Sequence, residues 1–365
     1  MFYNLFRNRS VKVLIFTLLI FITIISGCKS DTQEISYKNL SIQLESDIDK
    51  YYKDFDFSGN ILVAKGENIL FKKSYGFSDI EQKTLNTSET RFLIGSLAKQ
   101  FTGMAIMQLV ERGMLNVDDK IIKYIDGFPE GNKITIQHLL THTSGLERDI
   151  KFDPIPSPLP TNQNEAIELI KSSYQINLLF TPGESFSYSN LGYELLGYII
   201  EKVSGMSYKD YLEKNIFTPL NMTNTGFGYD RYSNKLLALG YNLKKECLIK
   251  DKFIDLTLES GAAGIYSTVE DLYKWDRSLY KNKLVSKKSM ENIFNGGKFK
   301  YGYGWYIESD NGQRIYKHTG LEGGFYSFIS RMVDQDVCII ILSNVDDDGT
   351  AAFNLNNLII DRLKL

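Results

Sequence analysis

The sequence predicts an α+β fold, in which an antiparallel sheet is built from both ends of the chain and carries an inserted, mainly helical lobe. Short apolar runs typical of strands occur near residues 61–71 and return after Gly302. Helical patterns lie between them, interrupted by polar and Pro-containing stretches. One sheet flanked by helices accommodates this order, and a site is expected where the sheet and the helical lobe meet.

The first two strands are expected over Ile61–Ala64 and Ile69–Phe71. The segment Lys65–Asn68 between them contains a Gly and is typical of a tight turn, so the two strands should form an antiparallel hairpin. The later strands and a closing helix are expected at Trp305–Ile307, Arg314–Lys317, Phe325–Met332, Val337–Leu342 and Ala351–Leu365.

A buried helix is expected over Ser96–Glu111, because apolar residues occupy nearly every side of it. Arg112 and Gly113 supply its end: a basic residue in the last turn, followed by a residue that tolerates the left-handed conformation. Leu191–Val203 has a second helical pattern. These helices place the centre of the protein next to Ser96.

The composition is that of an ordinary globular protein. The chain has 365 residues, of which 43% are hydrophobic and 24% are charged, and this allows a large core and two lobes. Its formal charge of -2 gives no electrostatic attraction to nucleic acid, so a small-molecule or peptide substrate fits better. Beyond the N-terminal region only Cys247 and Cys338 remain, too few for a disulfide framework, and neither is expected to be catalytic.

The N-terminus has the features of an export signal. Arg7, Arg9 and Lys12 precede the uncharged run Val13–Ile25, which is too short to span a bilayer comfortably. The residues that end at Cys28 resemble a bacterial lipobox. That resemblance implies that Cys28 becomes the lipidated N-terminus of an exported lipoprotein, anchored to a membrane of the bacterial cell envelope. An uncleaved membrane anchor with an incidental Cys is the alternative.

These features set the expected domain boundaries. Residues 28–44 are polar with few large apolar groups, which is typical of a tether. The expected division is a signal peptide over 1–27, the tether over 28–44 and a folded domain over 45–365, with the sheet lobe in about 45–105 and 265–365 and the helical lobe in about 106–264.

Ser96 and Lys99 form a Ser-x-x-Lys quartet at the start of the buried helix. At this spacing the hydroxyl and the amine share one helix face. The motif is weak by itself, because Ser278 and Lys281 have the same spacing in a polar stretch, and an N-cap with a surface Lys is the structural alternative. Only the first copy stands where free backbone amides and the positive end of a helix dipole point at incoming charge.

A Lys must become neutral before it can act as a base. Its ordinary pKa is about 10.4, so lowering that pKa to near 7 costs about 4 kcal/mol. Burial together with a helix N-terminus can supply this, whereas an exposed Lys281 would not experience it.

Two further motifs follow along the chain. Tyr188-Ser189-Asn190 precedes the second helix; other Tyr-x-Asn triplets are expected to be solvated turns, at Tyr37–Asn39, Tyr232–Asn234 and Tyr280–Asn282. His318-Thr319-Gly320 ends a strand pattern, where a Gly lets another backbone approach closely. His318 and Thr319 could orient a substrate carboxylate from an edge strand, and the amide that follows Gly320 could stabilise an oxyanion.

In this order the three motifs resemble those of the class C β-lactamase and DD-peptidase superfamily, the serine β-lactamases and penicillin-binding proteins. Two flanking stretches, Ile134–Leu146 and Gly261–Thr268, share the resemblance, which covers roughly Ile61–Ser343. It implies a β-lactamase-like fold and a serine hydrolase that works without a cofactor. The implied roles are the nucleophile for Ser96, proton transfer for Lys99 and Tyr188, substrate or proton-network contacts for Asn190, His318 and Thr319, and oxyanion binding for the backbone amides of Ser96 and Leu321.

The third motif bears on the substrate. β-Lactamases of this type usually have Lys where this chain has His318, so the resemblance favours a DD-carboxypeptidase, a D-amino-acid peptidase or an esterase. A β-lactamase is the alternative. A non-catalytic lipoprotein that binds penicillin or senses peptidoglycan fragments is the alternative from another class. Tyr188 could serve as a base if it is partly deprotonated beside Lys99.

His138 and His142 have a spacing that could bind zinc on one helix face. The residues between them lack the Glu of a His-Glu-x-x-His site, and a chain with 3 His suggests no third ligand. No metal is therefore expected.

Overall fold

The computed structural model describes residues 36–53, 57–149, 160, 162–173, 177–228, 234–244, 247–251 and 261–363. The expected signal peptide and Cys28 lie outside these ranges. Within them, no helix combines the length and the apolar character that crossing a membrane would need.

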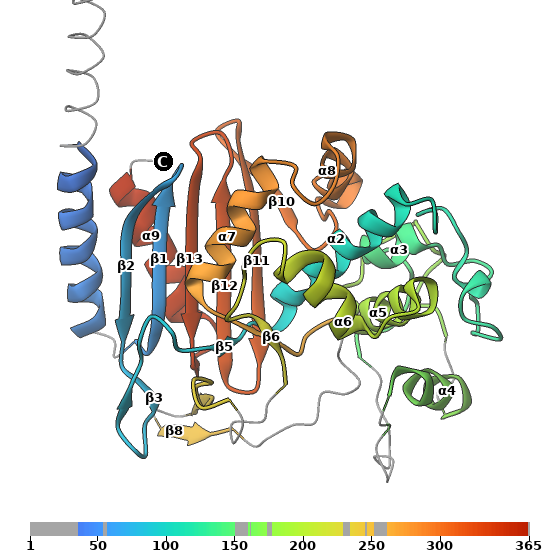
Figure 1. The fold of residues 1–365 in the computed structure, drawn as a ribbon, viewed down its shortest axis with the longest axis horizontal. Helices are drawn as coiled ribbons and strands as arrows, with labels where there is room; N and C mark the ends of the chain where they lie inside the picture. The colour runs from blue at the N-terminus through green and yellow to red at the C-terminus, as the bar shows by residue number, and fades with distance from the viewer. Residues whose placement is uncertain are drawn as a thin grey trace, which may run out of the picture.

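The centre of the molecule is a six-stranded antiparallel sheet with the strand order β10-β11-β12-β13-β1-β2 (Figure 1). The strands from the two ends of the chain meet where β1 pairs with β13, with Ile61 opposite Ile341. The prediction of one sheet built from both termini is therefore confirmed. The strands are β1 (Gly59–Lys65), β2 (Asn68–Tyr75), β10 (Tyr306–Asp310), β11 (Gln313–Glu322), β12 (Phe325–Met332) and β13 (Val337–Ser343).

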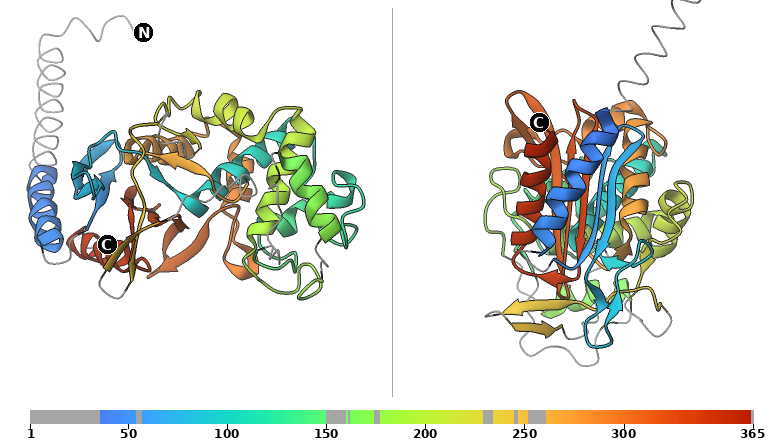
Figure 2. Two further views of the ribbon diagram at one scale, coloured as in Figure 1. Left: turned by 90° about the horizontal axis from the view of Figure 1, so that it is seen from below. Right: turned by 90° about the vertical axis from the view of Figure 1, so that its left-hand side faces the viewer.

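The sheet is buried on both faces because helices cover each of them. In β1, Ile61 and Val63 point to one core cluster and Leu62 and Ala64 to the other, as the alternation of a strand requires. The first cluster is covered by the helix of residues 36–53 and by α9 (Thr350–Leu363), which lie side by side on that face (Figure 2). The second cluster faces the remaining helices and the site.

The helix of residues 36–53 corrects the expected tether. Residues 36–44 are helical, and Leu44 and Ile48 are 0% and 1% exposed against the sheet. They belong to the folded domain. The error has a physical cause: only one stripe of this helix contacts the sheet, so its sequence is mostly polar and resembles a linker.

The inserted lobe is mainly helical, as expected, and its central helix α2 (Ala98–Glu111) is buried from Ala98 to Leu109. Helix α5 (Asn190–Ser204) contacts α2, and the ring centre of Phe101 in α2 lies 4.5 Å from that of Trp275. Short strands that the sequence did not suggest also occur in this segment. The remaining helices are α3 (Ile136–Leu140), α4 (Gln163–Ser173), α5 (Asn190–Ser204), α6 (Tyr208–Leu212), α7 (Val269–Tyr280) and α8 (Lys287–Ile293), and the added strands are β6 (Gly226–Phe227), β7 (Tyr241–Lys244) and β8 (Cys247–Lys250).

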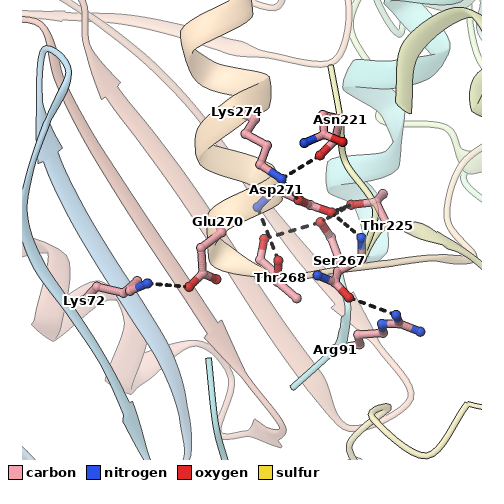
Figure 3. A network of polar contacts seen from close by, with 10 residues as sticks. Lys72, Arg91, Asn221, Thr225, Ser267, Thr268, Glu270, Asp271 and Lys274 are labelled. Carbon is pink, nitrogen blue, oxygen red and sulfur yellow. Dashed lines mark hydrogen bonds and ion pairs between the residues drawn. The ribbon is translucent and has the colours of Figure 1, made fainter. Parts of the chain in front are cut away.

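A small sheet, β5-β9-β6, holds the segments that lead into the site. It joins β5 (Phe92–Leu93), just before Ser96, to β9 (Ile265–Ser267). Figure 3 shows the polar network beside it, in which the buried carboxylate of Asp271 accepts hydrogen bonds from Thr225 at 3.0 Å and from Lys274 at 2.7 Å. The network ties the start of α7 to the segment that enters β6.

Both cysteines of the described chain are free. Cys338 is buried in β13, as its apolar surroundings predict, and Cys247 is exposed in β8.

Candidate active site

Ser96 lies in the 3₁₀ turn Gly95–Leu97 that leads directly into α2. Gly95 has a φ of +48°, and a Cβ at this position would lie 2.8 Å from the backbone nitrogen of Leu321. Only Gly lets the turn approach β11 so closely. The close approach brings the backbone of Ser96 next to the end of the strand that carries the third motif.

Lys99 is fully buried and its amine contacts the hydroxyl of Ser96. Lys99 Nζ lies 3.0 Å from Ser96 Oγ and 2.9 Å from the carbonyl oxygen of Ala262, to which it donates a hydrogen bond. No role was predicted for that carbonyl. It holds the amine as a second partner beside the hydroxyl.

The second Ser-x-x-Lys quartet has the same sequence spacing, but its serine and lysine side chains have other partners. Ser278 Oγ donates a hydrogen bond to the carbonyl of Trp275, within its own helix. The side chain of Lys281 is 51% exposed and forms an ion pair with Glu67. The two quartets thus differ in their surroundings, as context suggested.

Tyr188 reaches the same place from the segment before α5. Lys99 Nζ lies 5.1 Å from the centre of its ring, and a hydrogen bond links its side chain to that of Ser96. Burial raises the pKa of Tyr188 above its ordinary value, with the Ser96 hydrogen bond acting in the opposite direction. The side chain is therefore a neutral phenol near pH 7, and the partly deprotonated form that we considered is not favoured.

Asn190 begins α5, two residues after Tyr188. Its side-chain nitrogen donates to Asp149 at 2.6 Å, and its backbone nitrogen donates to the carbonyl of Arg148. Its side-chain oxygen is buried and has no hydrogen-bond partner within the described ranges. Its contact with substrate stays a prediction, because a buried acceptor without a protein partner calls for one that the structure does not show.

His318 is 2% exposed in β11 and is held by two hydrogen bonds. Nδ1 lies 2.6 Å from the carbonyl of Thr319, which can only accept, so Nδ1 carries the proton and Nε2 accepts from the Tyr301 hydroxyl at 3.0 Å. Burial is the largest cause that lowers the pKa of His318, to about 3. His318 is therefore neutral near pH 7 and cannot supply the charge of a Lys.

The end of β11 has one open side. Strand β10 pairs only with Gln313–Lys317, so the part from His318 onward has no β10 neighbour. Thr319 is half-buried there and the side chain of Leu321 is 56% exposed. The structure thus brings the first, second and third motifs around Ser96.

The neutral state of His318 predicts an effect on stability. Unfolded His has a pKa near 6.5, so the unfolded chain binds more protons than the folded chain between about pH 6.5 and pH 3, and stability falls as the pH drops through this range. When the pH falls from about 7 to about 5, we expect the free energy of unfolding to decrease in both proteins. The decrease should be about 2 kcal/mol smaller in His318→Gln than in the parent. Urea unfolding at both pH values measures this, and equal losses in the two proteins would contradict it.

His138 and His142 are engaged in structural contacts. His138 Nδ1 accepts from the backbone of Thr135, which caps α3, and His142 Nδ1 accepts from the backbone of Ser189. The His142 ring lies 4.2 Å from that of Tyr188, centre to centre. In the described part of the chain no three side chains suited to a metal come together.

Several contacts of the site were not predicted from the sequence. They involve the ring of His142 under Tyr188, the carbonyl of Ala262, and the buried carboxylates of Glu194 and Glu322. His142 and Ala262 lie within the family-like stretches, whereas Glu194 and Glu322 follow the second and third motifs, and the partners of all four are distant in the sequence. These residues stand close to recognisable motifs in the sequence, but no local pattern assigned them a role.

A hydroxyl and a buried amine in contact, beside a phenol at the seam of a sheet and a helical lobe, define the class of β-lactamase-like serine hydrolases. The family model described as Beta-lactamase matches residues 49–364, and the chain belongs to that family.

Individual proteins are similar to this chain in sequence and in structure. The chain is 32% identical over 319 residues to "Penicillin-binding protein 4*" of Bacillus subtilis, covering 80% of this chain and 69% of the relative. It is similar in structure to a penicillin binding protein from Bacillus halodurans, with a TM-score of 0.73, 27% identity and coverage of 86% and 98% of the two chains. FmtA from Staphylococcus aureus gives a TM-score of 0.76, 25% identity and coverage of 88% and 89%.

Proposed function

We propose that this protein hydrolyses D-amino-acid peptides, in the manner of a DD-carboxypeptidase, or esters, through an acyl-enzyme on Ser96. The observation that carries the proposal is the buried Lys99 amine, 3.0 Å from Ser96 Oγ and held by the carbonyl of Ala262. Burial disfavours the charged form of an amine, and a neutral amine in hydrogen-bond contact with a hydroxyl is able to accept its proton.

The proposed reaction has two halves. Ser96 Oγ attacks the substrate carbonyl while its proton passes to Lys99, and the backbone amides of Ser96 and Leu321 stabilise the oxyanion. The bond to the leaving amine or alcohol then breaks, and that group takes a proton relayed through the hydroxyl of Tyr188. In the second half water attacks the acyl ester and gives a proton to the same groups. The bond between the acyl carbon and Ser96 Oγ then breaks, Oγ takes that proton back, and a carboxylic acid is released.

The third motif supports a peptide or ester substrate. Because His318 is neutral, we propose that substrate recognition rests on hydrogen bonds that the Thr319 hydroxyl donates and that the side-chain oxygen of Asn190 accepts. The relatives named penicillin-binding proteins support a peptide that ends in D-amino acids, since their names describe binding to a β-lactam. Peptidoglycan fragments are the proposed natural source of such peptides.

A panel of substrates tests the proposed specificity. We expect turnover of a D-Ala-D-Ala peptide or a chromogenic ester to exceed that of a cephalosporin. The reason is that the neutral His318 occupies the position where β-lactamases of this type usually have a charged Lys. The measurement is kcat/KM for each substrate under the same conditions. A cephalosporin as the best substrate would instead indicate a β-lactamase, and binding without turnover of any substrate would indicate a sensor.

The location in the cell is a further part of the proposal. We propose an exported lipoprotein anchored through Cys28, on the basis of the lipobox-like sequence and of relatives that bind penicillin. Incorporation of labelled palmitate that is unchanged in Cys28→Ser would refute the anchor.

A further inference from the structure

We propose that Glu322 is a positioning residue that holds together the three segments carrying the nucleophile, the amine's acceptor and an oxyanion-binding amide. Glu322 lies at the end of β11, directly after Leu321. The inference deepens the proposed function, on which it rests, by assigning a role to a buried acid that does not itself touch the substrate.

The contacts of Glu322 reach two other segments of the chain. Its carboxyl group accepts the backbone amide of Gly264, at 3.2 and 3.3 Å to its two oxygens, and the backbone amide of Gly95. Gly95 directly precedes Ser96, whose amide is one proposed oxyanion donor. The neighbouring Leu321 carries the other. One carboxylate therefore connects the two halves of the proposed oxyanion hole.

Gly264 extends this connection to the amine. It belongs to the loop of residues 261–264, in which the carbonyl of Ala262 accepts the hydrogen bond from Lys99. A second buried carboxylate, that of Glu194 in α5, holds the other end of the loop by accepting the backbone amide of Ala262 at 3.0 Å. The loop is thus fixed from the sheet by one acid and from the helical lobe by another.

The burial of Glu322 indicates that its carboxyl group has a structural role. The residue is 8% exposed, and burial raises its pKa to about 8, with the backbone amides and Lys99 acting in the opposite direction. Burying a carboxyl group opposes folding unless hydrogen bonds compensate for it. For Glu322 the compensating donors are the backbone amides of Gly95 and Gly264, which belong to the segments that form the site. Its side chain can therefore set the positions of these two segments relative to each other.

Truncation of Glu322 should therefore act on the chemical step. In Glu322→Ala the amides of Gly95 and Gly264 lose their common acceptor, and a shift of about 1 Å in a catalytic group can reduce a rate about 100-fold. We expect acylation to slow about 100-fold with little change in KM, because the oxyanion forms only after the substrate has bound. Glu322→Gln retains one acceptor oxygen and should recover most of this rate.

Glu201 provides a matched control. It is a half-buried acid whose pKa is also raised by burial, and it accepts the backbone amide of Tyr208 at 2.6 Å, at the far end of α5. Glu201→Ala removes a comparable contact outside the site. Its acylation rate per folded molecule should equal that of the parent.

The experiment measures two quantities on the parent, Glu322→Ala, Glu322→Gln and Glu201→Ala. The first is the acylation rate with a chromogenic ester, normalised to the folded fraction from circular dichroism. The second is backbone hydrogen exchange in peptides that cover residues 93–98, 261–266 and 319–324. We expect slower acylation and faster exchange in all three peptides for Glu322→Ala, partial recovery for Glu322→Gln, and no change in these peptides for Glu201→Ala.

The two readouts separate this inference from the proposed function. If the parent hydrolyses no substrate, the proposed function fails, while faster exchange confined to the three peptides of Glu322→Ala still supports the positioning role. Unchanged exchange in these peptides overturns the role. A parent-like acylation rate in folded Glu322→Ala also overturns it.

Discussion

Replacing Ser96 with Ala should abolish ester and D-peptide hydrolysis, with kcat falling by roughly 10⁴-fold to 10⁶-fold. The hydroxyl oxygen is the atom that forms the acyl bond in the proposed reaction, and no other hydroxyl takes its place. Ser96 is half-buried at the start of α2, so the fold should survive the loss of one oxygen. Steady-state kinetics with a chromogenic ester measures the effect.

Ser278→Ala is the matched control for this substitution. Ser278 has the same Ser-x-x-Lys spacing, but its hydroxyl contacts only the backbone of Trp275 among the described residues. Its removal should leave kcat unchanged. If Ser96→Ala turned over substrate as fast as Ser278→Ala, Ser96 would have no part in the mechanism.

Replacing Lys99 with Met should lower kcat about 1,000-fold, within the range expected for the loss of a general base. Met has a similar length and no charge, so it fills the buried space but cannot accept the proton of Ser96. The carbonyl of Ala262 loses its donor, which should also reduce stability by about 1 to 3 kcal/mol. Single-turnover kinetics and thermal unfolding measure the two effects separately.

Lys281→Met serves as the control for Lys99→Met. Lys281 is exposed and pairs with Glu67 at the surface, so its replacement should change neither rate nor stability by a measurable amount. A Lys99→Met enzyme with a parent-like rate would show that the amine is not the base.

The centre of the sheet could be predicted from the sequence because β1 and β13 contain continuous apolar runs. The residues of β1 and β13 are buried almost without exception, and their apolar runs are visible in the sequence alone. The helix of residues 36–53 was missed because only a narrow stripe of it, around Leu44 and Ile48, contacts the sheet. The short strands β7 and β8 were missed for a similar reason, since β8 is exposed along its length.

The motifs of the site could be predicted, but the contacts that organise them could not. Ser96 and Lys99 are near neighbours in sequence, so helix geometry allows their contact, and the buried surroundings of this quartet distinguish it from Ser278 and Lys281. Lys99 and Ala262 are 163 residues apart, and Gly264 and Glu322 are 58 apart. A single sequence has no local pattern that pairs such distant groups.

The central claim is that Ser96 accepts an acyl group, and mass spectrometry of the trapped protein tests it most directly. The protein is exposed to a fluorophosphonate and to penicillin, and its intact mass and peptide masses are then determined. The account predicts one adduct per chain, located on Ser96 and missing from Ser96→Ala. An adduct on a different residue, or an adduct that persists in Ser96→Ala, would contradict the account.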